Sequence, residues 1–158
     1  MIKTLLLLFF IAFPQKQETR VKEKEMDLYT FLWQKKLAKQ WEMVEEVFIE
    51  CIVNADASTL LSLWAFLEEP QKRVLVQNDH FFPLSDTIER KMPPLTAFVK
   101  IHSTNKKAKI KDCMIIVKEL IRYKASWEGL EDDDMPIMNL WLDSEAVNLL
   151  RSTNNTPL

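Results

Sequence analysis

The side chains most often used in acid–base and metal chemistry are scarce in this chain. It contains two histidines, His80 and His102, and neither belongs to an HExxH motif or has a second metal ligand four residues away. Asp79 directly precedes His80, but adjacent residues of a helix or strand do not face each other. We therefore predict no catalytic and no metal-binding role for either histidine, and we expect both in a loop or at the edge of the core.

The two cysteines, Cys51 and Cys113, each lie within an apolar run. Apolar surroundings raise the pKa of a thiol and lower its reactivity, which argues against a nucleophilic cysteine. The chain has one glycine, which excludes a nucleophile elbow and a glycine-rich phosphate loop. We predict no enzymatic activity and no cofactor. Two buried free thiols are the favoured interpretation; a Cys51–Cys113 disulfide, which requires an oxidising compartment, is the alternative.

Four consecutive acidic residues, 131–134, precede the last apolar stretch of the chain. They lack the ligand spacing and the central glycine of an EF-hand calcium loop. One interpretation is a solvent-exposed loop before a helix, and another is an acidic docking surface that carries an exposed tryptophan as its anchor. This candidate interaction surface consists of Asp132, Asp133, Asp134, Met135, Met138 and Trp141.

Residues 100–112 form a basic stretch with five lysines, one aspartate and no arginine. Sequence-specific recognition of nucleic acid favours arginine and aromatic stacking, so a solvent-exposed loop is the favoured interpretation and contact with a phosphate backbone the weaker one. Because the charges are opposite, the stretch and the acidic run are also candidates to meet within the fold or between copies. The candidate basic patch consists of Lys106, Lys107, Lys109 and Lys111.

Hydrophobic periodicity in the first half of the chain predicts two helices. Apolar residues between Trp33 and Cys51 recur at steps of three and four, which is typical of one face of a helix over 27–54 with Asp27 as its N-cap. Residues 58–68 have almost no polar side, which predicts a central helix capped by Asp56. The side chains expected to be buried around this central helix are Trp64, Phe66 and Leu67, with Trp41, Val44 and Phe48 on one side and Val117 and Leu120 on the other.

The second half is also predicted to be helical, with two ambiguous segments. Residues 95–102 fit both the alternation of a strand and one face of a helix, and the scarcity of glycine favours the helix. Residues 73–77 fit either a short strand or a helix that begins at Pro70. The scarcity of glycine argues against hairpins, so Asp86 is interpreted as the cap of a short helix over 87–92. The remaining helices are predicted over 95–102, over 111–127 with Gly129 as its left-handed C-terminal residue, and within 137–150. The predicted fold class is all-α, either an irregular helical bundle or a short α-solenoid-like array of antiparallel helices, with a possible short extended segment near 73–77.

The N-terminal segment has two incompatible interpretations. Lys3 and the apolar run that follows it have the length of a signal peptide, too short to span a bilayer, but no pair of small residues marks a cleavage site. A Leu/Phe run ending in Pro-Gln is also what translation of an intron's pyrimidine tract would give, so that the chain would be part of something longer. The predicted organisation is an apolar segment 1–15, a charged lead-in 16–26, a single helical domain 27–151 and a loose tail 152–158.

These patterns favour a non-enzymatic helical module for protein–protein interaction, as part of a larger scaffold or regulatory protein. A net charge of −2 gives no overall attraction for nucleic acid. We expect a protein partner, no transmembrane span, and a cytoplasmic or nuclear location. The first alternative is a secreted helical ligand or carrier with the Cys51–Cys113 disulfide. A weaker alternative is a helical nucleic-acid-associated domain that uses the loop 106–111.

Overall fold

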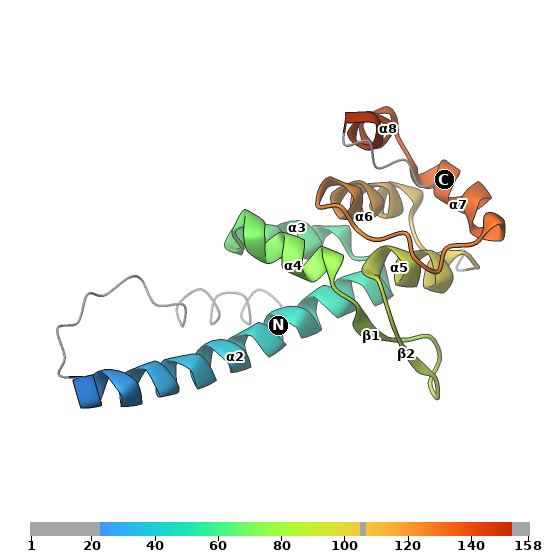
Figure 1. Ribbon diagram of the computed structural model, residues 1–158. Coiled ribbons are helices and arrows are strands. Elements are labelled where there is room, and N and C mark those ends of the chain that lie inside the picture. The colour runs from blue at the N-terminus through green and yellow to red at the C-terminus, as the bar shows by residue number, and fades with distance from the viewer. Residues whose placement is uncertain (1–22, 105–106, 153–158) are drawn as a thin grey trace. The chain divides into compact units, whose positions relative to one another are not determined.

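The computed structural model of the chain describes residues 23–104 and 107–152, and most of them are helical (Figure 1). The chain divides into two compact units, one ending at Val47 and the other beginning at Phe48. Within the described residues the fold is a helical bundle with one two-stranded sheet, which confirms the predicted all-α class. None of the described helices combines the length and the apolar character that a membrane span needs.

Helix α2 (Glu23–Asn54) is 32 residues long and continues from the first unit into the second. It ends where the sequence predicts, but Asp27 lies inside the helix and is not its N-cap. Along the predicted stripe, Phe48 and Cys51 are buried and Trp41 is half-buried. Val44 is buried as well, whereas the side chains of Trp33 and Leu37 lie outside the described residues.

Helix α3 (Ala57–Phe66) begins at the predicted cap, because the side chain of Asp56 accepts a hydrogen bond from the backbone N–H of Thr59 at 3.0 Å. The near absence of a polar side in 58–68 predicts a helix that is covered on several sides, and this prediction is wrong. Leu61 is 45% exposed, and Leu60 and Leu63, rather than the half-buried Phe66, are its most buried side chains. Ser58 and Ser62 make the exposed side partly polar, so the helix needs cover on one face only.

Helix α4 (Glu69–Gln77) includes the ambiguous segment 73–77, which is therefore helical and not extended. Its start combines a proline in the first turn with a backbone hydrogen bond from Glu68 N–H to the side chain of Gln71 at 3.0 Å. These start signals, together with the burial of Leu75 and Val76, outweigh the β-branched character of the segment.

The extended structure lies further along the chain, in an antiparallel hairpin of β1 (His80–Pro83) and β2 (Glu89–Met92). The short helix predicted over 87–92 is wrong. The hairpin turns without glycine because Ser85 Oγ accepts hydrogen bonds from the backbone N–H groups of Thr87 and Ile88, at 3.3 and 3.1 Å. His80 and Phe82 place the buried face of β1 against the helices.

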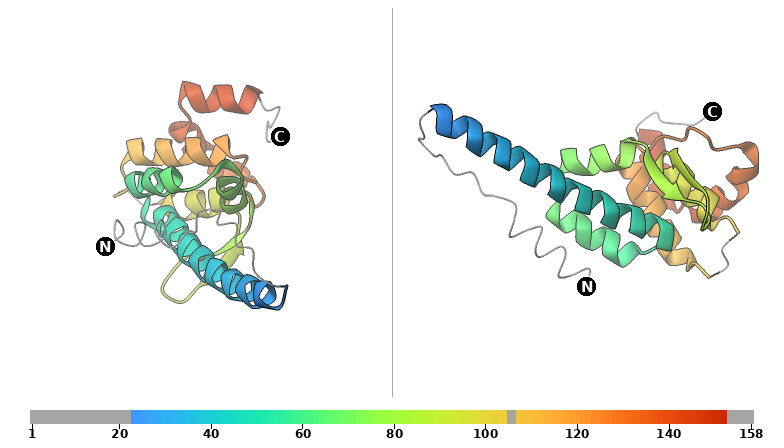
Figure 2. Two further views of the ribbon diagram at one scale, coloured as in Figure 1. Left: turned by 90° about the vertical axis from the view of Figure 1, so that its left-hand side faces the viewer. Right: turned by 90° about the horizontal axis from the view of Figure 1, so that it is seen from below.

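Helices α5 (Pro94–His102) and α6 (Ile110–Arg122) follow the hairpin, and α6 is the helix at the centre of the second unit (Figure 2). It contacts α3 and α5 and also the two C-terminal helices, and Val117 and Leu120 are buried in it as predicted. The helix ends five residues earlier than predicted. Lys124, with a φ of 63°, takes the left-handed position expected of Gly129, which lies in a later turn with a φ of 88°.

The C-terminal part consists of a short 3₁₀ turn, η1 (Asp132–Asp134), and the helices α7 (Met135–Trp141) and α8 (Ser144–Ser152). The apolar stretch 137–150 is therefore divided between two helices, and Asp143 accepts a hydrogen bond from Ala146 N–H at 2.8 Å at the start of the second. Lys118 of α6 forms ion pairs with Asp143 and Glu145, at 3.1 and 3.2 Å, which hold α8 against α6. The segments 1–22 and 153–158 lie outside the described residues, and with them the predicted N-terminal boundary at 15.

Candidate binding pocket

The structure divides the residues of the predicted acidic docking surface between solvent and core. Asp132 and Asp133 are exposed, but Met138 is fully buried, and Trp141, 3% exposed, packs edge-on against Phe98 with 5.3 Å between ring centroids. Met135 is half-buried and Asp134 is buried. The reason is that α7 turns its apolar side onto α6, so the tryptophan expected to anchor a partner is part of the core.

The candidate basic patch is solvent-exposed where the structure describes it. Lys107, Lys109 and Lys111 are exposed on the approach to α6 and in its first turn, while Lys106 lies outside the described residues. Lys100 of the same stretch instead reaches the acidic run, with 2.7 Å between its Nζ and Asp134 Oδ2. The prediction that the two charged stretches meet within the fold is confirmed at this one contact.

Both histidines are buried and hold the fold together. His80 Nε2 donates to the carbonyl of Leu75 at 2.7 Å, and the ring contacts Phe48 and Phe82 edge-on. His102 Nε2 donates to the carbonyl of Ile52 at 2.8 Å, and burial lowers the pKa of His102 although this hydrogen bond opposes the shift. Each ring thus connects two segments of the fold through a hydrogen bond to a main-chain carbonyl.

Both cysteines are buried with free thiols, in agreement with the favoured interpretation of the sequence. Burial raises the pKa of Cys51 to about 12, and the neighbouring Asp56 and Glu50 add to the shift. Burial likewise raises the pKa of Cys113 to about 11, with a contribution from Asp112. The disulfide of the secreted alternative is not present. Among the described residues, no group of three histidine, cysteine or acidic side chains is placed to hold a metal ion.

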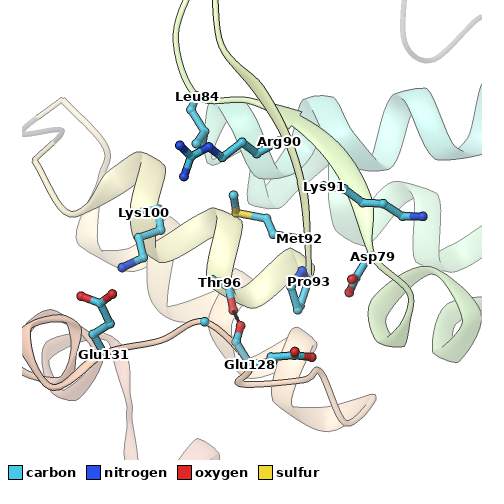
Figure 3. Close-up of a pocket in the computed structure, with 11 residues that line it drawn as sticks. Asp79, Leu84, Arg90, Lys91, Met92, Pro93, Thr96, Lys100, Glu128 and Glu131 are labelled. Atoms are coloured by element: carbon cyan, nitrogen blue, oxygen red, sulfur yellow. Dashed lines mark hydrogen bonds between the residues drawn. The ribbon is translucent and has the colours of Figure 1, made fainter.

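An open pocket of about 540 Å³ lies between the hairpin, α5 and the turn after Trp127 (Figure 3). Such a volume is within the range of ligand sites, about 300–1,000 Å³. Its walls combine charged side chains with apolar surface from Leu84, Met92 and Pro93. The basic lining residues are Arg90, Lys91 and Lys100, and the acidic lining residues are Asp79, Glu128 and Glu131.

Arg90 is a cation of this pocket whose charge no ion pair or ring contact of the described residues engages. Lys100 is already paired with Asp134, and Lys91 Nζ lies 5.8 Å from the centroid of the Phe81 ring. Arg90 is exposed, and nothing in the described part of the chain forms an ion pair with it. Figure 3 shows Arg90 and Met92 on one side of β2 and Lys91 on the other, as the alternation of a strand requires.

The floor of the pocket is a fixed contact between α5 and the turn. Thr96, 3% exposed, donates its hydroxyl to the carbonyl of Glu128 at 2.5 Å. A Cβ atom at Gly129 would lie 3.2 Å from Thr96 Cγ2, and the φ of 88° at this position is one that other residues rarely adopt. The glycine therefore allows the turn to lie close to α5.

The sequence did not reveal this pocket, because its central residues fall in the segment predicted as a helix over 87–92. A usable signal was present: Pro83 and the pair Pro93–Pro94 bracket a segment that contains the polar run Ser85-Asp86-Thr87. Proline at the edges of two short segments and a serine-led turn between them are typical of a hairpin even where glycine is missing.

Comparison with models of known protein families gives no match, and neither the search of curated proteins nor that of solved structures finds a similar chain. Function must therefore be inferred from the geometry of the pocket.

Proposed function

We propose that the chain is a non-enzymatic helical module that binds a protein partner through the pocket beside β2. The observation that carries the proposal is the exposed guanidinium of Arg90, which stands next to the apolar Met92 at an open pocket. Arginine is enriched among the residues that dominate interface energies, because its planar fork binds a carboxylate in two places and its stem packs on apolar atoms.

The elements around the pocket support binding because contacts within the chain already fix their positions. β2 is paired with β1 on one side and continues into the two prolines that begin α5. The opposite wall is tied to α5 by Thr96 and by the pair of Lys100 and Asp134. A preformed site loses less conformational entropy on binding than a mobile one, so more of the contact energy remains as affinity.

A site-specific crosslinking experiment tests this function. A photoreactive amino acid replaces Lys91 at the pocket or, as the control, Lys111, which is exposed at the start of α6. In cells that express the protein, we expect a discrete crosslinked protein from position 91 only, and we expect Arg90→Glu to abolish it while Lys111→Glu does not. If positions 91 and 111 give the same crosslinked product, or if Arg90→Glu leaves the product from position 91 unchanged, the pocket is not the binding site.

Nucleic-acid association is a second candidate, which the exposure of Lys107, Lys109 and Lys111 favours. Binding through phosphates releases counterions, so the logarithm of the affinity would fall with the logarithm of salt concentration at a slope of about −0.9 for each phosphate contacted. Three lysines would give a slope of about −2.7 at most. An affinity that does not change with salt, or no binding at low salt, would eliminate this candidate.

A further inference from the structure

The main-chain hydrogen bonds of the hairpin determine which backbone groups of β2 face outward. Leu84 N–H donates to the carbonyl of Ile88 at 2.8 Å, and the register of the strands places His80 opposite Met92. In an antiparallel ladder, hydrogen-bonded pairs alternate with pairs that are not hydrogen-bonded. Counting from the Leu84–Ile88 pair, the pairs that are not hydrogen-bonded are Phe81 with Lys91 and Pro83 with Glu89.

The backbone N–H and C=O groups of Glu89 and Lys91 therefore point away from β1. No hydrogen bond to them occurs from the residues that the structure describes. The two edges of the hairpin differ in this respect. On the edge of β1 the corresponding residues are Phe81 and Pro83, and the proline has no N–H to offer. The edge of β2 keeps both donors and both acceptors.

The pocket runs along this same edge. The consecutive residues Arg90, Lys91 and Met92 of β2 all line it, as does Pro93 at the start of α5. Side chains of a strand alternate between its two faces, so a pocket over one face would be lined by every second residue. A run of consecutive lining residues places the space beside the strand, where the outward groups of Lys91 are.

We propose that β2 receives an extended segment of the protein partner as a third strand, in the manner of β-strand addition. This inference depends on the proposed function and specifies how the partner is held. Side chains of the added segment that lie beside Arg90 and Met92 share the face of the sheet on which these two residues lie. The partner therefore carries an acidic residue opposite Arg90 and an apolar residue opposite Met92, two positions apart.

The first step of the test uses a phage-displayed library of linear nine-residue peptides, selected on the full chain. We expect enrichment of segments with an acidic and an apolar residue two positions apart, and loss of their binding to Arg90→Glu. Two versions of a selected peptide are N-methylated on the backbone, one at the odd positions and one at the even positions. Because only every second amide faces β2, we expect one version to lose binding and the other to keep it.

Two variants at position 91 separate a backbone contact from a side-chain contact. Lys91→Pro removes the outward N–H without removing a bond to β1, and Pro83 shows that the opposite strand holds proline at an equivalent outward position. Lys91→Gln removes the charge and keeps the N–H. We expect Lys91→Pro to weaken peptide binding at least about tenfold, or 1.4 kcal/mol, and Lys91→Gln to weaken it less than about threefold.

Amide hydrogen exchange supplies a readout that does not depend on the proline variant folding. Saturating peptide is expected to slow exchange at Lys91 N–H and not at Lys111 N–H. Unchanged exchange at Lys91, failure to enrich any peptide, or full binding by a folded Lys91→Pro protein would overturn strand addition. If the wild-type protein is a dimer and Lys91→Pro makes it a monomer, the added strand comes from a second copy of the chain and not from a partner protein. With the photoreactive amino acid placed at Glu128, which is exposed and also lines the pocket, cellular crosslinking that survives Lys91→Pro would leave the proposed function standing and strand addition refuted.

Discussion

Lys100 and Asp134 lie 34 positions apart in the chain and form an ion pair with 2.7 Å between Nζ and Oδ2. The same carboxylate oxygen accepts the backbone N–H of Glu131 at 2.9 Å. One side chain thus connects α5 to the turn that forms the acidic wall of the pocket. The acidic run, which the sequence presents as a possible docking surface, in this way supplies a structural support for the pocket instead.

Asp134→Asn is expected to destabilise the protein by about 1–2 kcal/mol, because hydrogen bonds to a charged group contribute about 1.5–3 kcal/mol and partial exposure of Lys100 reduces that value. Asp133→Asn, at an exposed neighbour, is the matched control and should change the free energy of unfolding by less than about 0.5 kcal/mol. Urea unfolding measures both. Equal losses in the two variants would mean that the ion pair contributes nothing specific.

The local signals of the sequence predicted most helices correctly, and they failed where a contact distant in the chain decides the structure. Asp56 caps α3 through Thr59, three residues away, so the sequence shows both partners. Trp141 is buried because it meets Phe98, and no periodicity of α7 shows that contact. The seven residues of α7 are also too few to display a clear apolar stripe.

The pocket could not be predicted for a related reason. A scarcity of glycine argues only against hairpins with two-residue turns, whereas this hairpin uses a longer loop closed by the hydroxyl of Ser85. A helix predicted over 87–92 gives Arg90 and Met92 no relation to Glu128. The hydrogen bond from Thr96 to the Glu128 carbonyl is what brings that residue near them. Only the tertiary fold places these three residues around one space.

Stability is expected to fall as the pH drops below about 6.5, the pKa of an unperturbed histidine. Burial lowers the pKa of His102 in the folded protein, so in that range the unfolded chain binds a proton that the folded one does not. The free energy of unfolding at pH 7.5 and at pH 5.5, from urea titrations, measures the effect. His102→Gln keeps a donor for the carbonyl of Ile52 and should reduce the difference; an unchanged difference would assign it to other groups.

The thiols of Cys51 and Cys113 are expected to react with a disulfide reagent such as DTNB only when the protein opens. Burial raises the pKa of Cys51 to about 12 and that of Cys113 to about 11, so both thiols are protonated at pH 8. Guanidinium chloride should release two equivalents at the rate of a free thiol. Intact-mass measurement under non-reducing conditions provides the check, since a mass two units below that of the dithiol would restore the disulfide and the secreted alternative.

Trp64→Ala is expected to cost about 3–5 kcal/mol, the usual range for a large aromatic side chain removed from a core. Trp64 is 5% exposed, stacks on Phe48 at 5.8 Å and meets Tyr123 edge-on at 5.7 Å. Its indole N–H is buried and has no hydrogen-bond partner among the described residues. Trp64→Phe removes that unsatisfied donor and should therefore cost less than about 1.5 kcal/mol. If Trp64→Phe and Trp64→Ala lower the free energy of unfolding by similar amounts, the volume of the aromatic ring is not what stabilises the protein at this position.

Gly129→Ala is expected to destabilise the protein by about 1–2 kcal/mol, for two reasons that a second substitution separates. The φ of 88° is unfavourable for alanine, and the new methyl group would lie 3.2 Å from Thr96 Cγ2. Thr96→Ser removes that methyl group and keeps the hydroxyl that donates to Glu128. In the Thr96→Ser background, Gly129→Ala should lose less stability than in the wild type but not regain all of it, because the backbone strain remains. Thermal unfolding of the four proteins of this cycle measures the difference. Complete rescue by Thr96→Ser would mean that crowding alone requires the glycine, whereas no rescue would mean that the left-handed backbone of the turn requires it.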